Sequence, residues 1–219
     1  MSEEQVSQIK KLVEAMDYKA VREMLSDNPS LANEGWPYDQ ENTTKAHPLH
    51  RICDGVMSKT YTDEQAVEMA KIFLKFGADI NGNVSKEKSD TPLLAASSLR
   101  GDKVAILYID NGADILWKGC HGGTALHWAC WLGRDVVVER LLREKLDINQ
   151  KCIDFKSTPL FWTVHGWRFG GEKDRGENYI ACVKMLLNAG ADKTIPNFEG
   201  YTIAEMLTED DIELKKLLL

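Results

Sequence analysis

The sequence predicts an all-α protein built from repeated helix-turn-helix units, and three observations support this prediction. One short segment recurs as GADIN at Gly77, GADIL at Gly112, KLDIN at Lys145 and GADKT at Gly190. A second series runs out of phase with the first, as HPLHRIC at His47, TPLLAAS at Thr91, TALHWAC at Thr124, TPLFWTV at Thr158 and TIAEML at Thr202. Between the two series lie apolar-periodic stretches such as DVVVERLLREK (135–145), which are typical of amphipathic helices.

The spacing of the second series shows a repeat with two enlarged members. Its successive steps are 44, 33, 34 and 44 residues. A unit of about 33 residues therefore recurs with two insertions, and we place these at 55–64 and 166–178, between the two helices of their units. Long loops often carry function, so either insertion is a candidate contact with a partner.

This pattern resembles the ankyrin repeat family, whose TPLHxAA…G…VVxLLLxxGADxN motif is matched almost throughout from Thr124 to Asn149. The resemblance covers essentially the whole chain. It implies an ankyrin-repeat solenoid, in which hairpin loops join helix-turn-helix units, and it implies a protein-binding function.

The resemblance sets the expected order of units within one domain, residues 1–219. Residues 1–46 form a capping helix and a degenerate first unit, repeats follow at 47–90, 91–123, 124–157 and 158–201, and residues 202–219 form the C-terminal cap. Threonine before the first helix of a unit can cap that helix, and proline at its first position gives up an N–H that would lack a partner anyway. Lys145 stands where the other units have glycine, so the helix before it is expected to end differently.

Composition restricts the possible functions and location. The formal net charge of −7 argues against binding to the nucleic-acid backbone, which requires a basic surface. The chain has no apolar run of the roughly 18 residues that a membrane span needs, and its first residues do not resemble a secretory signal. Five cysteines without disulfide-like spacing favour reduced thiols and a cytoplasmic location. The acidic terminal segments favour a monomer.

The segment GTALHWACWLG (123–133) carries the clearest candidate binding residues. At about 100° per residue, Leu126, Ala129 and Cys130 share the inward face of the helix, and Trp128 and Trp131 lie on the opposite face. Large aromatic rings dominate the energetics of many interfaces, because they bury much area at a low entropic cost.

The same two outward positions recur in the other units, where they hold Trp162 with His165, Arg51 with Asp54, and Ala95 with Ser98. The resemblance implies that this face lines the concave groove of the stack. We therefore expect Trp128, Trp131, Trp162 and His165 to anchor a protein or peptide, Arg51 and Asp54 to orient it, and Ser98 to leave room beside the rings.

Two other interpretations of the tryptophans remain open. The rings can pack against each other as an extension of the core, or they can bind a small organic or cationic ligand, since indole faces attract cations.

Catalysis, a metal and a cofactor are not expected. Cysteine and histidine are zinc ligands, but His127 occupies the structural histidine position of the repeat and Cys130 faces inward, which leaves Cys120 and His121. The glycines of KGCHGGT (118–124) lack the GKS or GKT ending of a phosphate-binding loop.

Overall fold

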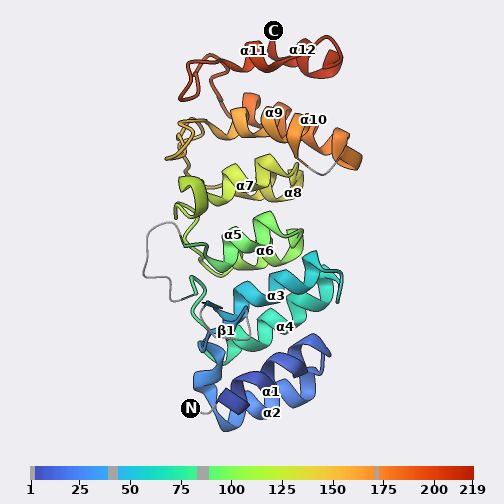
Figure 1. The fold of residues 1–219 in the computed structure, drawn as a ribbon, viewed down its shortest axis with the longest axis vertical. Helices are drawn as coiled ribbons and strands as arrows, with labels where there is room; N and C mark the ends of the chain where they lie inside the picture. The colour runs from blue at the N-terminus through green and yellow to red at the C-terminus, as the bar shows by residue number, and fades with distance from the viewer. Residues whose placement is uncertain (1–2, 39–43, 83–88, 171–172) are drawn as a thin grey trace. The chain divides into compact units, whose positions relative to one another are not determined.

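The computed structural model describes residues 3–38, 44–82, 89–170 and 173–219, and neighbouring helices joined by loops account for most of them (Figure 1). The packing of the chain divides it into two compact units, residues 1–86 with 90–114 and residues 87–89 with 115–219. The predicted all-α class is confirmed, because the strands of the described residues are limited to one short hairpin.

The first unit begins with the predicted capping helix and contains the helices of two of the predicted repeats. Its helices are α1 (Glu3–Glu14), α2 (Tyr18–Asp27), α3 (Pro48–Met57), α4 (Asp63–Lys75), α5 (Pro92–Ser98) and α6 (Asp102–Asp110), with a 3₁₀ turn η1 (Pro29–Ala32). Strands β1 (Trp36–Pro37) and β2 (Lys45–Ala46) pair in antiparallel register, with Trp36 opposite Ala46. Helix α3 packs against α4 and α5, and α6 packs against the same two helices.

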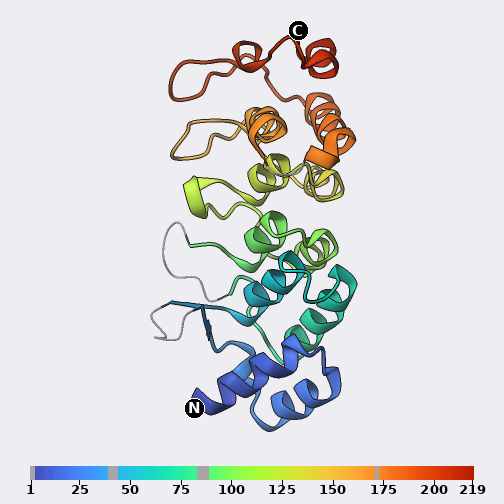
Figure 2. The same cartoon turned by 45° about the vertical axis from the view of Figure 1, so that its right-hand side comes forward.

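The second unit contains the remaining repeats and the C-terminal cap. Its helices are α7 (Ala125–Trp131), α8 (Asp135–Leu141), α9 (Pro159–Phe169), α10 (Gly176–Asn188), α11 (Ile203–Met206) and α12 (Ile212–Leu218), with 3₁₀ turns η2 (Cys120–Gly122) and η3 (Lys173–Arg175). Helix α7 packs closely along α9, and α8 packs along α10. Within this unit α7 and α9 lie between the loops and the pair α8 and α10 (Figure 2).

Local signals set the helix starts as the sequence predicts. The hydroxyls of Thr91 and Thr158 accept the backbone N–H three residues on, and proline follows each of them. His47 takes the place of threonine before α3, and its Nδ1 accepts the N–H of Leu49 at 3.2 Å. Thr124 and His127 form a reciprocal capping box at α7. These caps satisfy N–H groups that the first turn of a helix leaves without partners.

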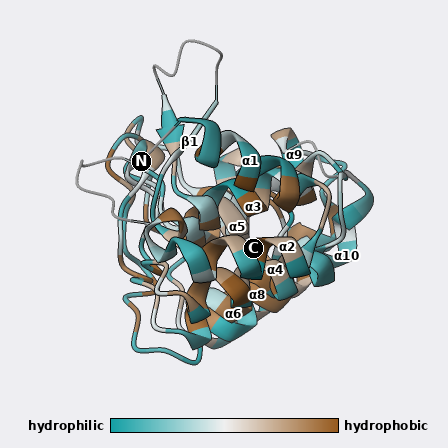
Figure 3. Ribbon diagram, turned by 90° about the horizontal axis from the view of Figure 1, so that it is seen from below, coloured by the Kyte–Doolittle hydropathy of each residue, from teal (hydrophilic) through white to brown (hydrophobic). Residues whose placement is uncertain are grey.

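The helices are amphipathic and pack through their apolar faces. Figure 3 shows apolar and polar residues on the same helices. The residues predicted to face inward on α7, namely Leu126, Ala129 and Cys130, are all buried, and so are Leu160, Thr163 and Val164 on α9.

The departure at Lys145 changes the end of its helix. Helix α6 ends at Asp110, directly before a turn in which Gly112 has a φ of +82°. Helix α8 already ends at Leu141, and Lys145 is not among the residues with positive φ. A lysine therefore occupies this position without the left-handed conformation that glycine adopts at little cost.

Both insertions lie between the helices of their units, as predicted. The first forms the end of α3 and the turn to α4, where the Tyr61 hydroxyl donates to the carbonyl of Ile52 at 2.9 Å. The second lengthens α9 to Phe169 and adds η3 before α10. Residues 171–172 of the second insertion, and residues 39–43 of the long first hairpin, lie outside the described residues.

Candidate functional site

The close packing of α7 and α9 brings together the four aromatic residues predicted as anchors. The ring of Trp162 lies with its centroid 5.3 Å from that of Trp128 and 6.1 Å from that of Trp131, nearly perpendicular to both. The ring of His165 stacks on Trp131 with a centroid distance of 4.8 Å. These residues are adjacent because one repeat separates equivalent positions on neighbouring helices.

Trp162 differs from the prediction that it faces solvent. Its side chain is 5% exposed, while Trp128 and Trp131 are half-buried. Besides the two indoles, His127 contacts the ring of Trp162 edge-on at 5.3 Å and Phe155 lies 6.3 Å away. Trp162 is therefore a buried side chain against which the more exposed rings pack. Edge-to-face contacts of this kind are favourable between aromatic side chains.

A cavity of about 410 Å³ opens against these rings. Helices α7 and α9 contribute Trp128, Trp131, Phe161, Trp162 and His165, and the loops contribute His121, Phe155, Ser157, Asn197, Phe198 and Glu199. A concave, mostly aromatic cavity with a few polar groups is the usual form of a ligand or side-chain binding site, and its volume is in the range of such sites.

Backbone hydrogen bonds hold the loop residues of the cavity in place. The N–H of Phe198 donates to the carbonyl of Phe155 at 2.9 Å, which joins the loops of successive repeats. The side-chain oxygen of Asn197 accepts the N–H groups of Glu199 at 3.0 Å and Tyr201 at 2.9 Å. This turn presents Phe198 and Glu199 side by side at the cavity.

His121 and Phe155 line the cavity from the loops and contact each other. The His121 ring lies 4.9 Å from the ring of Phe155 and 6.3 Å from that of Trp128. Its Nδ1 lies 3.3 Å from a carboxylate oxygen of Asp154. His121 adopts a φ of 57°, in a turn beside Gly122, whose φ is also positive. A Cβ atom at Gly122 would lie 2.3 Å from the Cβ of Ile153, so there is no space for a side chain there.

The candidate residues drawn from the sequence did not include Phe155, Phe161, Phe198 and Glu199, which also line the cavity. Phe161 lies next to Trp162 on the same helix, so its nearness was available from the sequence. Phe198 and Glu199 lie more than 30 residues further along the chain, in the loop after α10. The available signal was the repeat itself, because Phe155 and Phe198 occupy corresponding loops of consecutive units.

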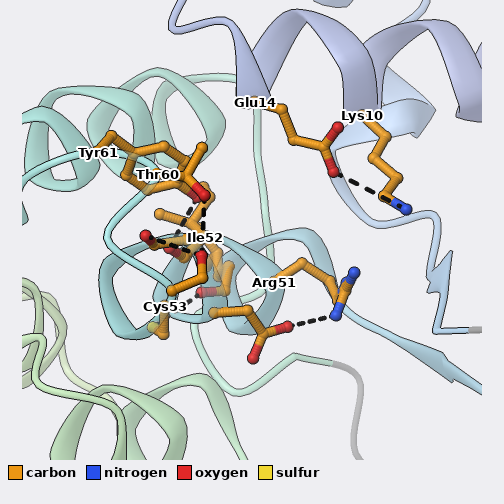
Figure 4. Close-up of polar contacts among 11 residues, drawn as sticks. Lys10, Glu14, Arg51, Ile52, Cys53, Thr60 and Tyr61 are labelled. Carbon is orange, nitrogen blue, oxygen red and sulfur yellow. Dashed lines mark hydrogen bonds and ion pairs between the residues drawn. The ribbon is translucent and has the colours of Figure 1, made fainter.

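The other three predicted residues lie in the first unit and are not among those that line the cavity. Arg51, labelled in Figure 4, forms an ion pair with Asp54 along α3. Its guanidinium also lies over the ring of Tyr38 at 4.2 Å. Ser98 is half-buried, and its hydroxyl donates to the carbonyl of Ala95 at 3.2 Å.

The charges at the cavity are few. No lysine or arginine lines it among the described residues, and Glu199 contributes a carboxylate. Burial lowers the pKa of His165, and the nearby Arg168 lowers it further, so this ring is neutral at pH 7. The guanidinium of Arg168 is held by the carbonyl of Met206.

The residues considered for zinc or nucleophilic chemistry have structural partners. The His127 ring accepts the N–H of Thr124 at Nδ1, at 3.2 Å, and its Nε2 lies 3.1 Å from the carbonyl of Gln150. Burial raises the pKa of the Cys130 thiol to about 12, which keeps it protonated. Within the described part of the chain, no group of three or more potential ligands is placed to hold a metal ion.

The paired helices and their hairpin loops define an ankyrin-repeat fold, and comparison with known proteins agrees. Residues 56–154 match the family model for ankyrin repeats in three copies. The crystal structure of EF0377, an ankyrin repeat protein, is similar with a TM-score of 0.69 and 26% sequence identity, over 97% of this chain and 96% of that one.

Both comparisons support the ankyrin-repeat family that the sequence motifs predict. Ankyrin repeats generally act as protein–protein interaction modules and as non-enzymatic scaffolds. In the described residues, the helices are too short or too polar to cross a lipid bilayer.

Proposed function

We propose that this protein is a non-enzymatic, cytoplasmic recognition module that binds another protein or a peptide at the aromatic cavity of its second unit. Trp128, Trp131 and His165 contact the partner as anchors. Trp162 is the buried side chain that holds the two other indole rings in place. The observation that carries the proposal is the cavity itself, because three indoles converge on one hollow of about 410 Å³. Aromatic residues around a pocket are the typical composition of interface hot spots.

Exposed apolar side chains beside the cavity favour a partner that is larger than the cavity. Phe169 and Phe198 are each 60% exposed, and Phe155 and Tyr201 are exposed as well. Phe169 contacts His165 with a ring distance of 4.7 Å, so it extends the aromatic surface along α9. Grouped apolar side chains on a protein surface commonly mark an interaction site.

Arg51, Asp54 and Ser98 have a secondary role in this proposal. The ion pair of Arg51 and Asp54, with Tyr38 against the guanidinium, presents charge and an aromatic ring together on the first unit. We propose that these groups orient the partner, and that Ser98 leaves space for it. The protein is proposed to act as a monomer and to bind neither nucleic acid nor membrane.

Affinity capture from a lysate of the source organism tests the proposal. We expect Trp128→Ala and Trp131→Ala to lose at least one protein that the unchanged chain retains, since each removes a partly exposed ring from the cavity. Leu116→Ala is the matched control, because Leu116 is an exposed apolar residue of the same unit outside the cavity.

The thermal unfolding midpoint of each variant separates lost binding from lost folding. If folded Trp128→Ala and Trp131→Ala retain the same proteins as the Leu116→Ala control, the cavity is not the recognition site.

A second candidate function is the binding of a small organic or cationic ligand, which the volume and the aromatic lining of the cavity favour. Saturable quenching of the tryptophan fluorescence by a compound, lost in Trp128→Ala, would support it. Quenching that is unchanged in Trp128→Ala would place the ligand elsewhere.

A further inference from the structure

We propose that the cavity of the second unit receives the methylated ammonium group of a lysine side chain in a partner peptide. This inference rests on the proposed function and adds the chemistry of the residue that the partner inserts. Three features of the cavity carry it: the arrangement of its rings, its charge, and the state of its polar groups.

The aromatic rings that line the cavity stand at steep angles to one another. Trp128 and Trp131 stand at 81° and 76° to Trp162, and Phe155 is tilted at 56° to it. An aromatic face carries partial negative charge, so an organic cation surrounded by several rings is attracted to each of them. Indole is the strongest of the natural side chains in this respect.

The charge of the cavity also favours a cation. Glu199 lines it, and its carboxylate has no ion-pair partner among the residues that the structure describes. Asp154 does not line the cavity, but its carboxylate lies 3.3 Å from Nδ1 of His121, which does. An anionic side chain would meet Glu199 without a lysine or arginine among the described lining residues to offset it.

The polar groups of the cavity favour a methylated ammonium over a free one. The Ser157 hydroxyl donates to the carbonyl of Phe155 at 3.0 Å, and the Asn197 side-chain oxygen already accepts two backbone N–H groups. An unmodified lysine would bring three N–H donors, for which the cavity offers chiefly the Glu199 carboxylate and the Ser157 oxygen as acceptors, and a buried donor left without a partner is costly. A trimethylated nitrogen carries the positive charge without any N–H group.

The exposed rings around the cavity favour a peptide as the carrier of this cation. A free quaternary ammonium compound would occupy the hollow and leave Phe169 and Phe198 exposed to water. Residues that flank a lysine in an extended peptide would cover both side chains and gain the hydrophobic energy of that burial.

Binding of a matched set of ten-residue peptides tests the proposal. In each peptide the flanking residues are randomised in the same way. The central position holds trimethyl-lysine, unmodified lysine, or a neutral isostere in which carbon replaces the nitrogen. Isothermal titration measures the dissociation constants of the best binders. We expect trimethyl-lysine to bind about tenfold more tightly than the isostere and than unmodified lysine.

Two variants test whether the Glu199 carboxylate causes the preference for the cation. Glu199→Gln should reduce the tenfold preference for the cation to about threefold while the affinity for the isostere stays the same, because the carboxylate acts on charge alone. Glu177→Gln removes an exposed carboxylate of α10 outside the cavity and should leave the preference unchanged. Both positions are exposed, so neither change should affect folding.

The outcomes separate this inference from the proposed function. If the isostere binds as tightly as trimethyl-lysine, the cation preference is wrong while peptide recognition stands. If choline binds as tightly as the best peptide, the cation belongs to a free ligand, and the proposal of a peptide partner is wrong. If no peptide binds at millimolar concentration but Trp128→Ala still loses a captured protein, the inference fails and the proposed function remains.

Discussion

Gly166 permits the close contact between α7 and α9 on which the cavity depends. A Cβ atom at this position would lie 2.0 Å from the carbonyl oxygen of Trp131 and 2.8 Å from its carbonyl carbon. These are backbone atoms, which cannot rotate away as the end of a flexible side chain can. The same Trp131 carbonyl accepts the Tyr179 hydroxyl at 2.8 Å, so it is held from a second direction.

Gly166→Ala is expected to lower the free energy of unfolding of the second unit by about 1–3 kcal/mol, the usual cost of an overpacked core. Urea titration followed by tryptophan fluorescence measures this change, since five of the six tryptophans lie in the second unit.

Gly176→Ala is the matched control for this prediction. A Cβ at Gly176 would meet the Trp167 ring at 3.4 Å, which is ordinary contact. Alanine is the better helix former by up to about 1 kcal/mol, so this variant should be unchanged or slightly stabilised. Equal effects of the two substitutions would mean that Gly166 is not required for close packing.

At the scale of elements, the second insertion supports the C-terminal cap. It carries Trp167 and Arg168 on the additional turn of α9, beyond the length of the other first helices. The indole N–H of Trp167 donates to the Asp211 carboxylate at 2.8 Å, and the guanidinium of Arg168 donates to the carbonyl of Met206. The same carboxylate accepts the N–H of Thr208 at 2.7 Å, which orders the turn before α12.

Trp167→Phe is expected to loosen α12 selectively. It removes the donor to a buried carboxylate, and a hydrogen bond to a charged group contributes about 1.5–3 kcal/mol. Amide hydrogen exchange in residues 212–218 should therefore become faster by roughly tenfold or more.

Trp117→Phe is the control for this second prediction. Trp117 donates its indole N–H to the carbonyl of Ser89 at 2.8 Å, far from α12 in sequence. This change should leave the exchange of residues 212–218 as it is. If Trp167→Phe also leaves the amide hydrogen exchange of residues 212–218 unchanged, the insertion does not stabilise the C-terminal cap.

At the scale of the whole molecule, buried histidines link the stability of both units to pH. His47 in the first unit and His127 in the second are buried, and burial lowers the pKa of each to about 4. A histidine in the unfolded chain binds its proton near pH 6.5. Between these two values the unfolded chain holds more protons than the folded chain does, so stability falls as the pH falls.

We expect the free energy of unfolding to decrease as the pH is lowered from 6.5 to about 4. Because one pKa unit is worth about 1.36 kcal/mol, each of the two histidines contributes roughly 3 kcal/mol to the loss. Urea titrations at pH 7, 5.5 and 4.5 measure the decrease, and tryptophan fluorescence reports mainly on the second unit.

His127→Gln isolates the contribution of the second unit. A glutamine can keep the capping hydrogen bond to Thr124 but does not titrate, so its stability should depend less on pH. The interpretation fails if His127→Gln and the unchanged chain lose stability in parallel.

The sequence by itself determined the helix pairs, the threonine caps of their first helices and the apolar faces that pack inward. These features depend on signals within a few residues, such as Thr158 followed by proline, and on the apolar periodicity of each helix. The adjacency of Trp128 and Trp162 also followed from the sequence, because one repeat separates them and repeats stack in order.

The tertiary structure alone decided how far each indole is covered and where the cavity lies. Phe155 and Phe198 come to one place because a backbone hydrogen bond joins two loops 43 residues apart, and no periodic pattern encodes the conformation of those loops. Trp162 is covered for the same reason, since its burial depends on rings from a neighbouring helix and a loop. Burial of a side chain is a property of all the segments that surround it, whereas helix formation depends mainly on the residues of one segment.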